Sequence, residues 1–187
     1  MAFNINGALL EFENDGISIT ANSVKGLKFD SSGRVQKDNR PYFIAQGNVA
    51  AWVNYSAAAW NDMVIANTIV NNGSGYNTST GRFTAPVTGI YYFMAQTYTQ
   101  KHTDTSYNSY THPLFYINGS YTSRQASSGI PYRLRSRTYN VGSYSTDTWI
   151  NDIFHLTAND YINIRIWSSG ALRHYNNRDM FAGFLIG

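Results

Sequence analysis

The segment from Asn71 to Phe93 constrains the fold of this 187-residue chain more than any other part of the sequence. It contains a glycine-rich turn, a second turn and the start of a long alternating segment. Between Phe83 and Ala95 every second residue is apolar or small, and the alternate positions include Arg82, Thr84, Thr88, Tyr92 and Gln96. This period of two is typical of a β-strand that buries one face. Gly89 lies on that buried face, so we expect a bulky neighbour to pack where its side chain would be.

The composition agrees with a fold built from strands. Aromatic residues make up 16% of the chain and charged residues only 13%, which is about half the usual share of charged residues. Asn, Ser, Thr and Gly take the places that Lys and Glu usually occupy, and this favours strands joined by tight turns over exposed helices. The length suits one domain of roughly 150 residues plus a short additional segment. The sequence therefore predicts an all-β protein.

An ordered motif runs through the same segment. Its nine positions are Gly75, Tyr76, Thr80, Gly81, Phe83, Pro86, Gly89, Tyr91 and Phe93. The motif resembles the signature of the complement 1q globular head family, and the terminal FAGFLIG, residues 181–187, is similar to the final strand of that family. The resemblance covers Pro41–Gly187. It implies an antiparallel jelly-roll sandwich of the complement 1q and tumour necrosis factor type, assembled as a tight homotrimer.

Residues 1–40 differ from the rest of the chain, because short apolar runs alternate there with turn residues. Their few large apolar side chains cannot form an independent core, so we expect them to be buried against copies of themselves. Pro41 marks the boundary, since proline favours an extended entry. The sequence thus predicts a β-rich anchor or trimerisation segment, residues 1–40, and a jelly-roll head, residues 41–187. Residues 16–35 also resemble the segment before the terminal head in fibre-like proteins of bacteriophages, particularly those of cyanobacteria.

Three further elements are predicted locally. Residues 114–122 form a hairpin around the two-residue turn Asn118-Gly119. Residues 162–167 form a late strand, because isoleucine alternates there with other residues. Residues 63–66 and 68–70 form a buried strand that Asn67 interrupts.

Patterns that carry enzyme chemistry are missing from the sequence. There is no nucleophile elbow, no zinc-binding helix motif and no cysteine. The histidines stand apart from one another and from carboxylates at metal-ligand spacing, and the aspartates are separated rather than clustered. Some members of the resembled family hold calcium near the trimer axis, but no matching ligand set is present. We predict no enzymatic activity, no cofactor and no metal site.

Several cellular environments are also disfavoured. No apolar run approaches the roughly 20 residues that span a bilayer, so no membrane insertion is expected. The N-terminus lacks the basic start and the apolar core of a signal peptide. A net charge of +3 is too small to indicate a nucleic-acid-binding protein. These features favour a protein that folds in a bacterial host cytoplasm and is then exposed on the surface of a virion.

Two groups of residues are candidates for binding a partner. In the anchor, apolar and acidic side chains suit contacts with another virion protein: Leu10, Glu11, Phe12, Glu13 and Asp15. In the head, Arg133, Arg135 and Arg137 are spaced by two, so on a strand they would project from one face toward a carboxylated, sulfated or phosphorylated host glycan. The alternatives are a solvated acidic turn for the first group and a solvated strand face for the second.

Three functions follow from the resemblances. The favoured hypothesis is a trimeric capsid decoration or cement protein of a phage, with an anchoring N-terminus that binds the capsid and an outward head. The second is the receptor-binding tip of a phage tail fibre. The third is a secreted binding module, which the lack of a signal peptide and of cysteines disfavours. The fold alone does not choose among them.

Overall fold

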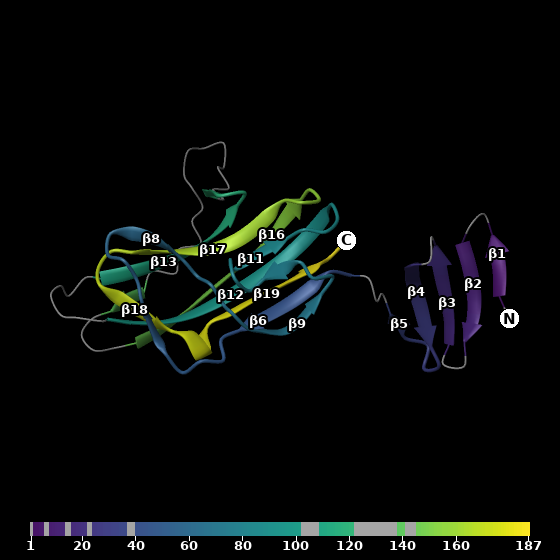
Figure 1. Cartoon of the computed structure of the whole chain (residues 1–187), viewed down its shortest axis with the longest axis horizontal. Helices are drawn as coiled ribbons and strands as arrows, with labels where there is room; N and C mark the ends of the chain where they lie inside the picture. Colours follow the sequence, from purple (N-terminus) through teal and green to yellow (C-terminus); the bar gives the residue numbers. More distant parts are fainter. Residues whose placement is uncertain are drawn as a thin grey trace. The chain divides into compact units, whose positions relative to one another are not determined.

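The computed structural model describes residues 2–5, 8–13, 16–21, 24–36, 40–101, 109–121, 138–140 and 145–187. The chain divides into two compact units, residues 1–40 and 41–187, which are traced in Figure 1. In the described parts of both units the regular structure is strand, except for the single 3₁₀ turn η1 (Asn176–Arg178). The predicted all-β class is confirmed.

The first unit is one antiparallel sheet in which each strand pairs with the next along the chain. Its five strands are β1 (Ala2–Ile5), β2 (Ala8–Glu13), β3 (Gly16–Ala21), β4 (Val24–Asp30) and β5 (Val35–Gln36). The last connection is a turn in which the backbone N–H of Gly33 donates to the Asp30 carbonyl at 2.9 Å, and Gly33 has φ +76°. The Asp30 carboxylate accepts from the backbone N–H of Ser32 and from the side chain of Arg34. These bonds follow from the predicted turn chemistry of this segment.

The second unit is a sandwich of two antiparallel sheets. The first, called here the β12 sheet, has the order β7-β18-β12-β19-β6-β9, and β16 also pairs with β12. Its strands are β6 (Tyr42–Gln46), β7 (Trp52–Asn54), β9 (Thr68–Asn72), β12 (Gly89–Lys101), β16 (Ser145–Leu156), β18 (Leu172–Tyr175) and β19 (Met180–Leu185).

The other sheet, called here the β17 sheet, has the order β10-β11-β17-β13-β14, with β8 beside β17 and β15 beside β13. Its strands are β8 (Ala59–Asp62), β10 (Tyr76–Asn77), β11 (Arg82–Thr84), β13 (Ser109–Ile117), β14 (Ser120–Tyr121), β15 (Thr138–Asn140) and β17 (Tyr161–Ser168). The predicted hairpin is β13–β14, with Asn118 and Gly119 at positive φ, and the predicted late strand is β17. Both predictions are confirmed.

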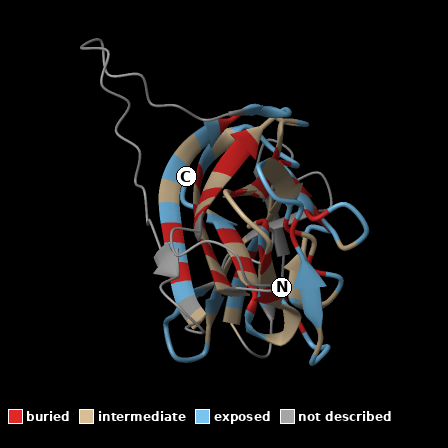
Figure 2. Ribbon diagram, turned by 90° about the vertical axis from the view of Figure 1, so that its left-hand side faces the viewer, coloured by how far each residue is buried: buried red, intermediate tan, exposed pale blue. Residues whose placement is uncertain are grey.

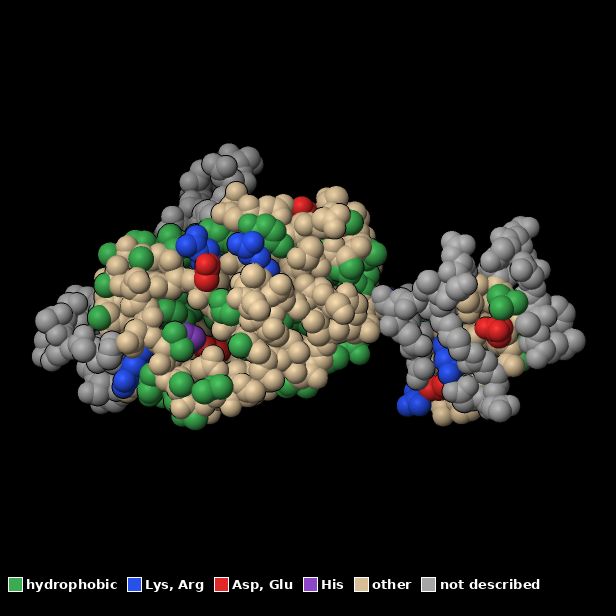
Figure 3. Space-filling view, in the orientation of Figure 1, with side chains coloured by type: hydrophobic (Ala, Val, Ile, Leu, Met, Phe, Trp, Pro, Cys, Tyr) green, Lys and Arg blue, Asp and Glu red, His purple; other side chains and the backbone are tan. Residues whose placement is uncertain are grey.

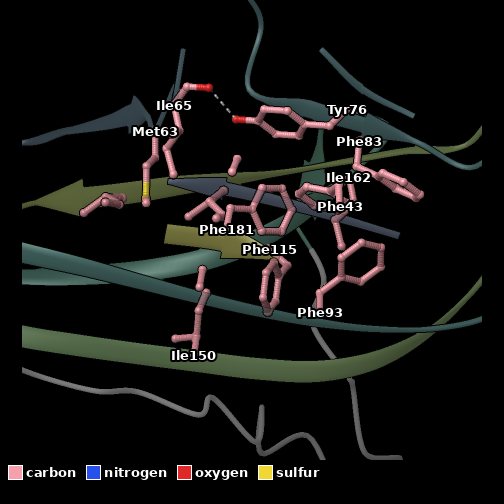
Figure 4. Packing of buried hydrophobic residues seen from close by; sticks show 14 of the residues in the cluster. Phe43, Met63, Ile65, Tyr76, Phe83, Phe93, Phe115, Ile150, Ile162 and Phe181 are labelled. Carbon is pink, nitrogen blue, oxygen red and sulfur yellow. Dashed lines mark hydrogen bonds between the residues drawn. The ribbon is translucent and has the colours of Figure 1, made fainter. Parts of the chain in front are cut away.

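The core lies between the two sheets, and burial alternates along their strands (Figure 2). At its centre Phe43 stacks on Phe83 and meets Phe181 edge-on, with ring centroids 4.9 and 4.8 Å apart. A Cβ at Gly183 would lie 2.3 Å from the Phe93 ring, so a glycine is needed there for the aromatic rings to pack. Figure 4 shows these rings together with the Tyr76 hydroxyl, which donates to the Ile65 carbonyl at 3.0 Å.

Two local expectations have different outcomes. A Cβ at Gly89 would lie 2.5 Å from Cδ1 of Leu185, so the predicted bulky neighbour is present. The prediction of a strand over residues 63–66 is wrong, because β8 ends at Asp62 and β9 begins at Thr68. Met63 and Ile65 are nevertheless buried. These buried side chains account for the apolar pattern in the sequence, although the segment forms no strand. The backbone N–H of Met63 donates to the carbonyl of Ile164 at 3.0 Å.

Candidate interaction surfaces

The outer face of the β12 sheet carries a band of exposed apolar side chains, called here the head face. Because alternate residues of β12 point inward, its remaining residues point away from the core. The register places Tyr92 between Ile153 and Phe184, and Phe184 beside Tyr42. The exposed fractions are 44% for Ile153, 47% for Phe184 and 42% for Tyr42. Four neighbouring strands therefore present one continuous apolar row to solvent.

Neighbouring rows extend the head face. Met94 lies between Asn151 and Ala182, and Ala182 pairs with Ile44. Ile90 and Trp149, at the two ends of this region, are 44% and 50% exposed. Contiguous exposed apolar area of this kind marks an interaction site. Figure 3 shows hydrophobic side chains reaching the surface of the head between wide polar areas on the side that faces the viewer.

The first unit has a similar feature, called here the anchor face. The register aligns Phe12, Ile17, Phe29 and Val35 across four strands. In the next row Leu10, Ile19 and Leu27 are aligned. The exposed fractions of Phe12, Ile17, Phe29 and Val35 are 47%, 37%, 38% and 54%. A five-stranded sheet thus has an apolar face that no other described element of its own unit covers.

The opposite face of the anchor sheet is polar. Glu11 pairs with Ser18 and Ser18 with Lys28, so these three side chains form one row. Of the predicted anchor residues, Leu10 and Phe12 therefore belong to the anchor face and Glu11 to the polar face. Glu13 ends β2. Asp15 lies outside the described residues, as do Arg133, Arg135 and Arg137, so the predicted arginine face stays a prediction.

Aromatic side chains also lie on the outer sides of both sheets of the head. Tyr98, Trp149 and Tyr175 lie on the outer side of the β12 sheet. Tyr116 and Trp167 lie on the outer side of the β17 sheet, where Trp60 contacts both rings edge-on with ring centroids 5.4 and 5.7 Å away. The aromatic content of the sequence, 16%, does not indicate which sheet carries these side chains.

A buried polar pair lies in the core at the β18 end of the head. Nδ1 of His174 contacts a carboxylate oxygen of Asp179, and the exposed fractions of the two residues are 3% and 0%. Burial raises the pKa of Asp179, and the hydrogen bond and charge of His174 oppose that rise. Sequence spacing had left His174 isolated. The structure brings the two together because β18 and β19 pair with successive parts of β12, at Thr99 and at Gln96, and η1 connects them.

Neighbouring core positions at this end are also polar. Thr97 and Thr99 on β12, Thr111 on β13, Thr148 on β16 and Ser168 on β17 are all buried. Within the described residues, no group of three or more His, Cys, Asp or Glu side chains could hold a metal ion. No described helix is long and apolar enough to cross a membrane. The His174–Asp179 pair and its polar neighbours are buried within the head.

Comparison with known proteins identifies relatives by family and by fold. Residues 50–186 match the family described as "C1q domain". No curated protein sequence is significantly similar to the chain. The globular domain of zebrafish complement 1qA protein has a TM-score of 0.54 and 17% identity, over 79% of this chain and 98% of that chain.

Two further solved structures share the fold. Eiger TNF from S. frugiperda has a TM-score of 0.54 and 12% identity, over 80% of this chain and 94% of that chain. Murine APRIL at pH 5.0 has a TM-score of 0.51 and 11% identity, over 79% and 99%. At such identities the similarity shows the fold alone. The predicted antiparallel jelly roll is confirmed, and the trimer stays a prediction.

Proposed function

Since this chain belongs to the C1q domain family, we propose that it is a non-enzymatic structural module that assembles as a homotrimer through its head and anchor faces. We further propose that the trimer decorates the capsid of a bacteriophage, with residues 1–40 as the base. Domains of this family are often trimeric. The observation that carries the proposal is the exposed apolar face on each of the two units.

The occupant proposed for the head face is another copy of the same chain. Ile153, Tyr92, Phe184 and Tyr42 form a row that contains no charged residue, which is the composition of the buried centre of an obligate interface. A closed threefold ring gives every copy the same contact and leaves no apolar face unpaired. Asp147 and Gln96, joined by a hydrogen bond of 3.0 Å, form part of the polar border of the head face.

The anchor face supports the same assembly. A sheet that exposes Phe12, Ile17, Phe29 and Val35 to this extent cannot be stable as a lone layer, because it has no second layer to form a core. Three such sheets can turn their apolar faces toward a common axis. The face that carries Glu11 and Lys28 then points outward, toward a capsid protein, with Ser18 buried between them.

The phage assignment rests on different observations. It is supported by the resemblance of residues 16–35 to segments of phage fibre-like proteins and by the lack of cysteines. A compact head joined to a small β-sheet unit suits a short decoration protein, since a long fibre would need another protein to supply its shaft. The tail-fibre tip and the secreted binding module are the competing outcomes of the experiments below.

The first experiment measures the mass of the pure protein by sedimentation equilibrium. We expect about three times the 21.0 kDa of a single chain, with no monomer at micromolar concentration. A monomer would contradict the proposed assembly. If a shortened chain of residues 41–187 sediments as a trimer as well, only the head face is needed for assembly.

The second experiment locates the protein in an intact particle by cryo-electron microscopy and compares particles that lack it. Bound decoration proteins stabilise the shell by mass action, so particles without the protein should release DNA at a lower temperature but still adsorb to cells. Normal thermal stability combined with lost adsorption would instead identify a tail-fibre tip. Failure to find the protein in any particle would overturn both phage hypotheses.

A further inference from the structure

Three aromatic side chains form a row at the β18 end of the β12 sheet, on its outer side. Trp52 pairs with Tyr175 in the register between β7 and β18, and Tyr98 lies on the neighbouring strand β12. The ring centroid of Trp52 lies 4.8 Å from that of Tyr175 and 6.0 Å from that of Tyr98. Tyr98 is held in turn by a hydrogen bond between its hydroxyl and Ser145. Together they make an aromatic platform across three strands.

Two arginines lie over this platform. The guanidinium carbon of Arg173 is 4.2 Å from the centroid of Trp52, and that of Arg178 is 4.3 Å from the centroid of Tyr98. Nη2 of Arg173 also donates to the side-chain carbonyl of Gln100 at 3.0 Å. Stacking of this kind orients a guanidinium group and leaves its N–H edge free for an anion.

Neither arginine has an acidic partner among the described residues. The adjacent Asp179 points into the core toward His174, and Asp147, across from Tyr98, accepts a hydrogen bond from Gln96. The platform therefore carries two positive charges that form no ion pair with a carboxylate of the described residues. Nε of Arg173 is buried without a hydrogen-bond partner, which is a further sign that this arginine is held in place by packing.

The platform adjoins one end of the head face, since Trp149 pairs with Gln96, two residues from Tyr98, but it lies away from the centre of that face. Tyr92, at the centre of the head face, and Tyr98 are six residues apart on β12, which corresponds to about 20 Å along a strand. Trp52 is 36% exposed, and it lies on β7, the outermost strand of the sheet at this end. A single chain thus contains the whole platform, so the inference does not rest on the proposed trimer or on the proposed phage role.

We propose that the platform, made of Trp52, Tyr98, Tyr175, Arg173 and Arg178, binds an acidic glycan. The ring of Tyr175, over which no described guanidinium group lies, and the exposed part of Trp52 suit the C–H faces of sugar rings, because the negative face of an aromatic ring attracts polarised hydrogen atoms. The two guanidinium groups suit the carboxylates of uronic or nonulosonic acids. Arg173 lies over Trp52 and Arg178 over Tyr98, and the centroids of these two rings are 6.0 Å apart. One short oligosaccharide can therefore reach both arginines.

The structure favours a glycan over other anionic polymers. Strand β7 has only three residues, which offers a bound peptide too short an edge for strand addition. Nucleic acid binding depends on many phosphate contacts, whereas the described platform supplies two arginines and the whole chain has a net charge of only +3. An acidic peptide is therefore the competing ligand in the test.

The first measurement follows the four tryptophan indole N–H signals by NMR while trigalacturonate, a carboxylated trisaccharide, is added to the full chain. The signal of Trp52 should shift in a saturable manner, and those of Trp60, Trp149 and Trp167 should stay in place. Maltotriose, a neutral trisaccharide of the same length, should leave all four unchanged. No saturable shift of Trp52 with trigalacturonate would overturn the proposal, as would an equal response to maltotriose.

Variants test the arginines. The double variant R173Q/R178Q should bind trigalacturonate at least tenfold more weakly than the natural chain. The matched control is R82Q, because Arg82 also caps a ring, that of Tyr161 at 4.3 Å, but on the β17 sheet; its affinity should stay within twofold. Equal weakening by R82Q, or none by R173Q/R178Q, would contradict the proposal. Should the double variant unfold, R178Q alone, at an exposed position, should still weaken binding at least threefold.

The competing ligand is tested with triglutamate under the same conditions. We expect trigalacturonate to bind at least tenfold more tightly, because only the sugar can stack on the platform. Tighter binding of triglutamate would assign the surface to acidic peptides and overturn the glycan proposal.

Discussion

The imidazole ring of His174 lies parallel to the phenol ring of Tyr55, with ring centroids 4.7 Å apart and an angle of 5° between the planes. His174 also contacts Asp179, so a histidine joins an aromatic neighbour to a buried carboxylate. Asp179 is fully buried. A buried carboxylate is tolerated only where a partner offsets its lost hydration. His174 is therefore the side chain on which the stability of this end of the core depends.

Replacing His174 by alanine should destabilise the head strongly. The change leaves Asp179 buried without its partner, which typically costs about 3 kcal/mol or more in the free energy of unfolding. Urea unfolding monitored by tryptophan fluorescence measures this loss. The control is H155A, because His155 is exposed on β16, and its effect should stay within about 0.5 kcal/mol. A comparable effect of both variants would contradict the assigned role of His174.

The loss in H174A should also depend on pH. Burial raises the pKa of Asp179, and without His174 that pKa should rise further. A group with a raised pKa in the folded state contributes stability below its unfolded pKa, and this contribution is lost as the pH rises through the folded value. The difference in unfolding free energy between the natural chain and H174A should therefore be larger at pH 7 than at pH 4. A constant difference over this range would contradict the prediction.

Alkaline pH should unfold the head through its buried tyrosines. Burial raises the pKa of Tyr76 to about 12, and burial also raises the pKa of Tyr55 and of Tyr91. Each of these side chains must stay neutral in the folded state, so stability is intact below pH 10 and falls as the pH rises from 10 toward 12. Tyr76 alone accounts for about 3 kcal/mol of that fall.

The variant Y76F tests this assignment. It should lose about 1 kcal/mol at pH 7, because the hydrogen bond to the Ile65 carbonyl is removed. Between pH 10 and pH 11.5 its unfolding free energy should fall less steeply than that of the natural chain. Y161F, at a partly exposed position on β17 outside the head face, should keep the natural slope. Identical slopes for all three proteins would show that Tyr76 does not govern alkaline unfolding.

Features that depend on residues close together in the chain could be predicted from the sequence. The alternation from Gly89 to Ala95 determines which side of β12 is buried, although the strand expected to begin at Phe83 is interrupted over residues 85–88. Asn118-Gly119 can adopt positive φ at both positions with little strain. The family motif lies in the same region, and its Phe83 and Tyr91 rings pack against each other in the core with centroids 5.6 Å apart. Fold class and several elements were therefore predictable.

Contacts between distant segments were not predictable in this way. The platform joins Trp52, Tyr98 and Tyr175, which come from three separate strands and become neighbours only through sheet pairing. The His174–Asp179 pair depends on the turn at η1, which has no strong sequence signal. The strand predicted over residues 63–66 is wrong because buried residues give the same apolar pattern whether or not they pair with a neighbouring strand.

Hydrogen exchange should separate the two units. Apart from Ser18, the described side chains of the anchor sheet are at least partly exposed, whereas β12 and β17 line the core of the head. Amides of β3 and β4 should therefore exchange faster than those of β12 and β17 when the protein is diluted below its assembly concentration, and should slow down on assembly. Slow exchange of β3 and β4 in an isolated peptide of residues 1–40 would contradict the proposed role of the anchor face.

The head face can be tested by placing a charge at its centre. In the variant I153D a carboxylate replaces a side chain that is 44% exposed in the single chain, so the head should still fold and keep its circular dichroism spectrum. In a trimer each of the three carboxylates would be buried without a partner, which costs several kcal/mol per subunit. Sedimentation should therefore detect monomers.

The matched control for I153D is V49D. Val49 is 57% exposed in the connection between β6 and β7 and does not belong to the head face. V49D should have the mass of the natural assembly, because the new carboxylate stays in water. If I153D sediments like the natural protein while remaining folded, the head face is not the interface. If V49D dissociates to the same extent, the loss reflects charge in general and not the position of Ile153.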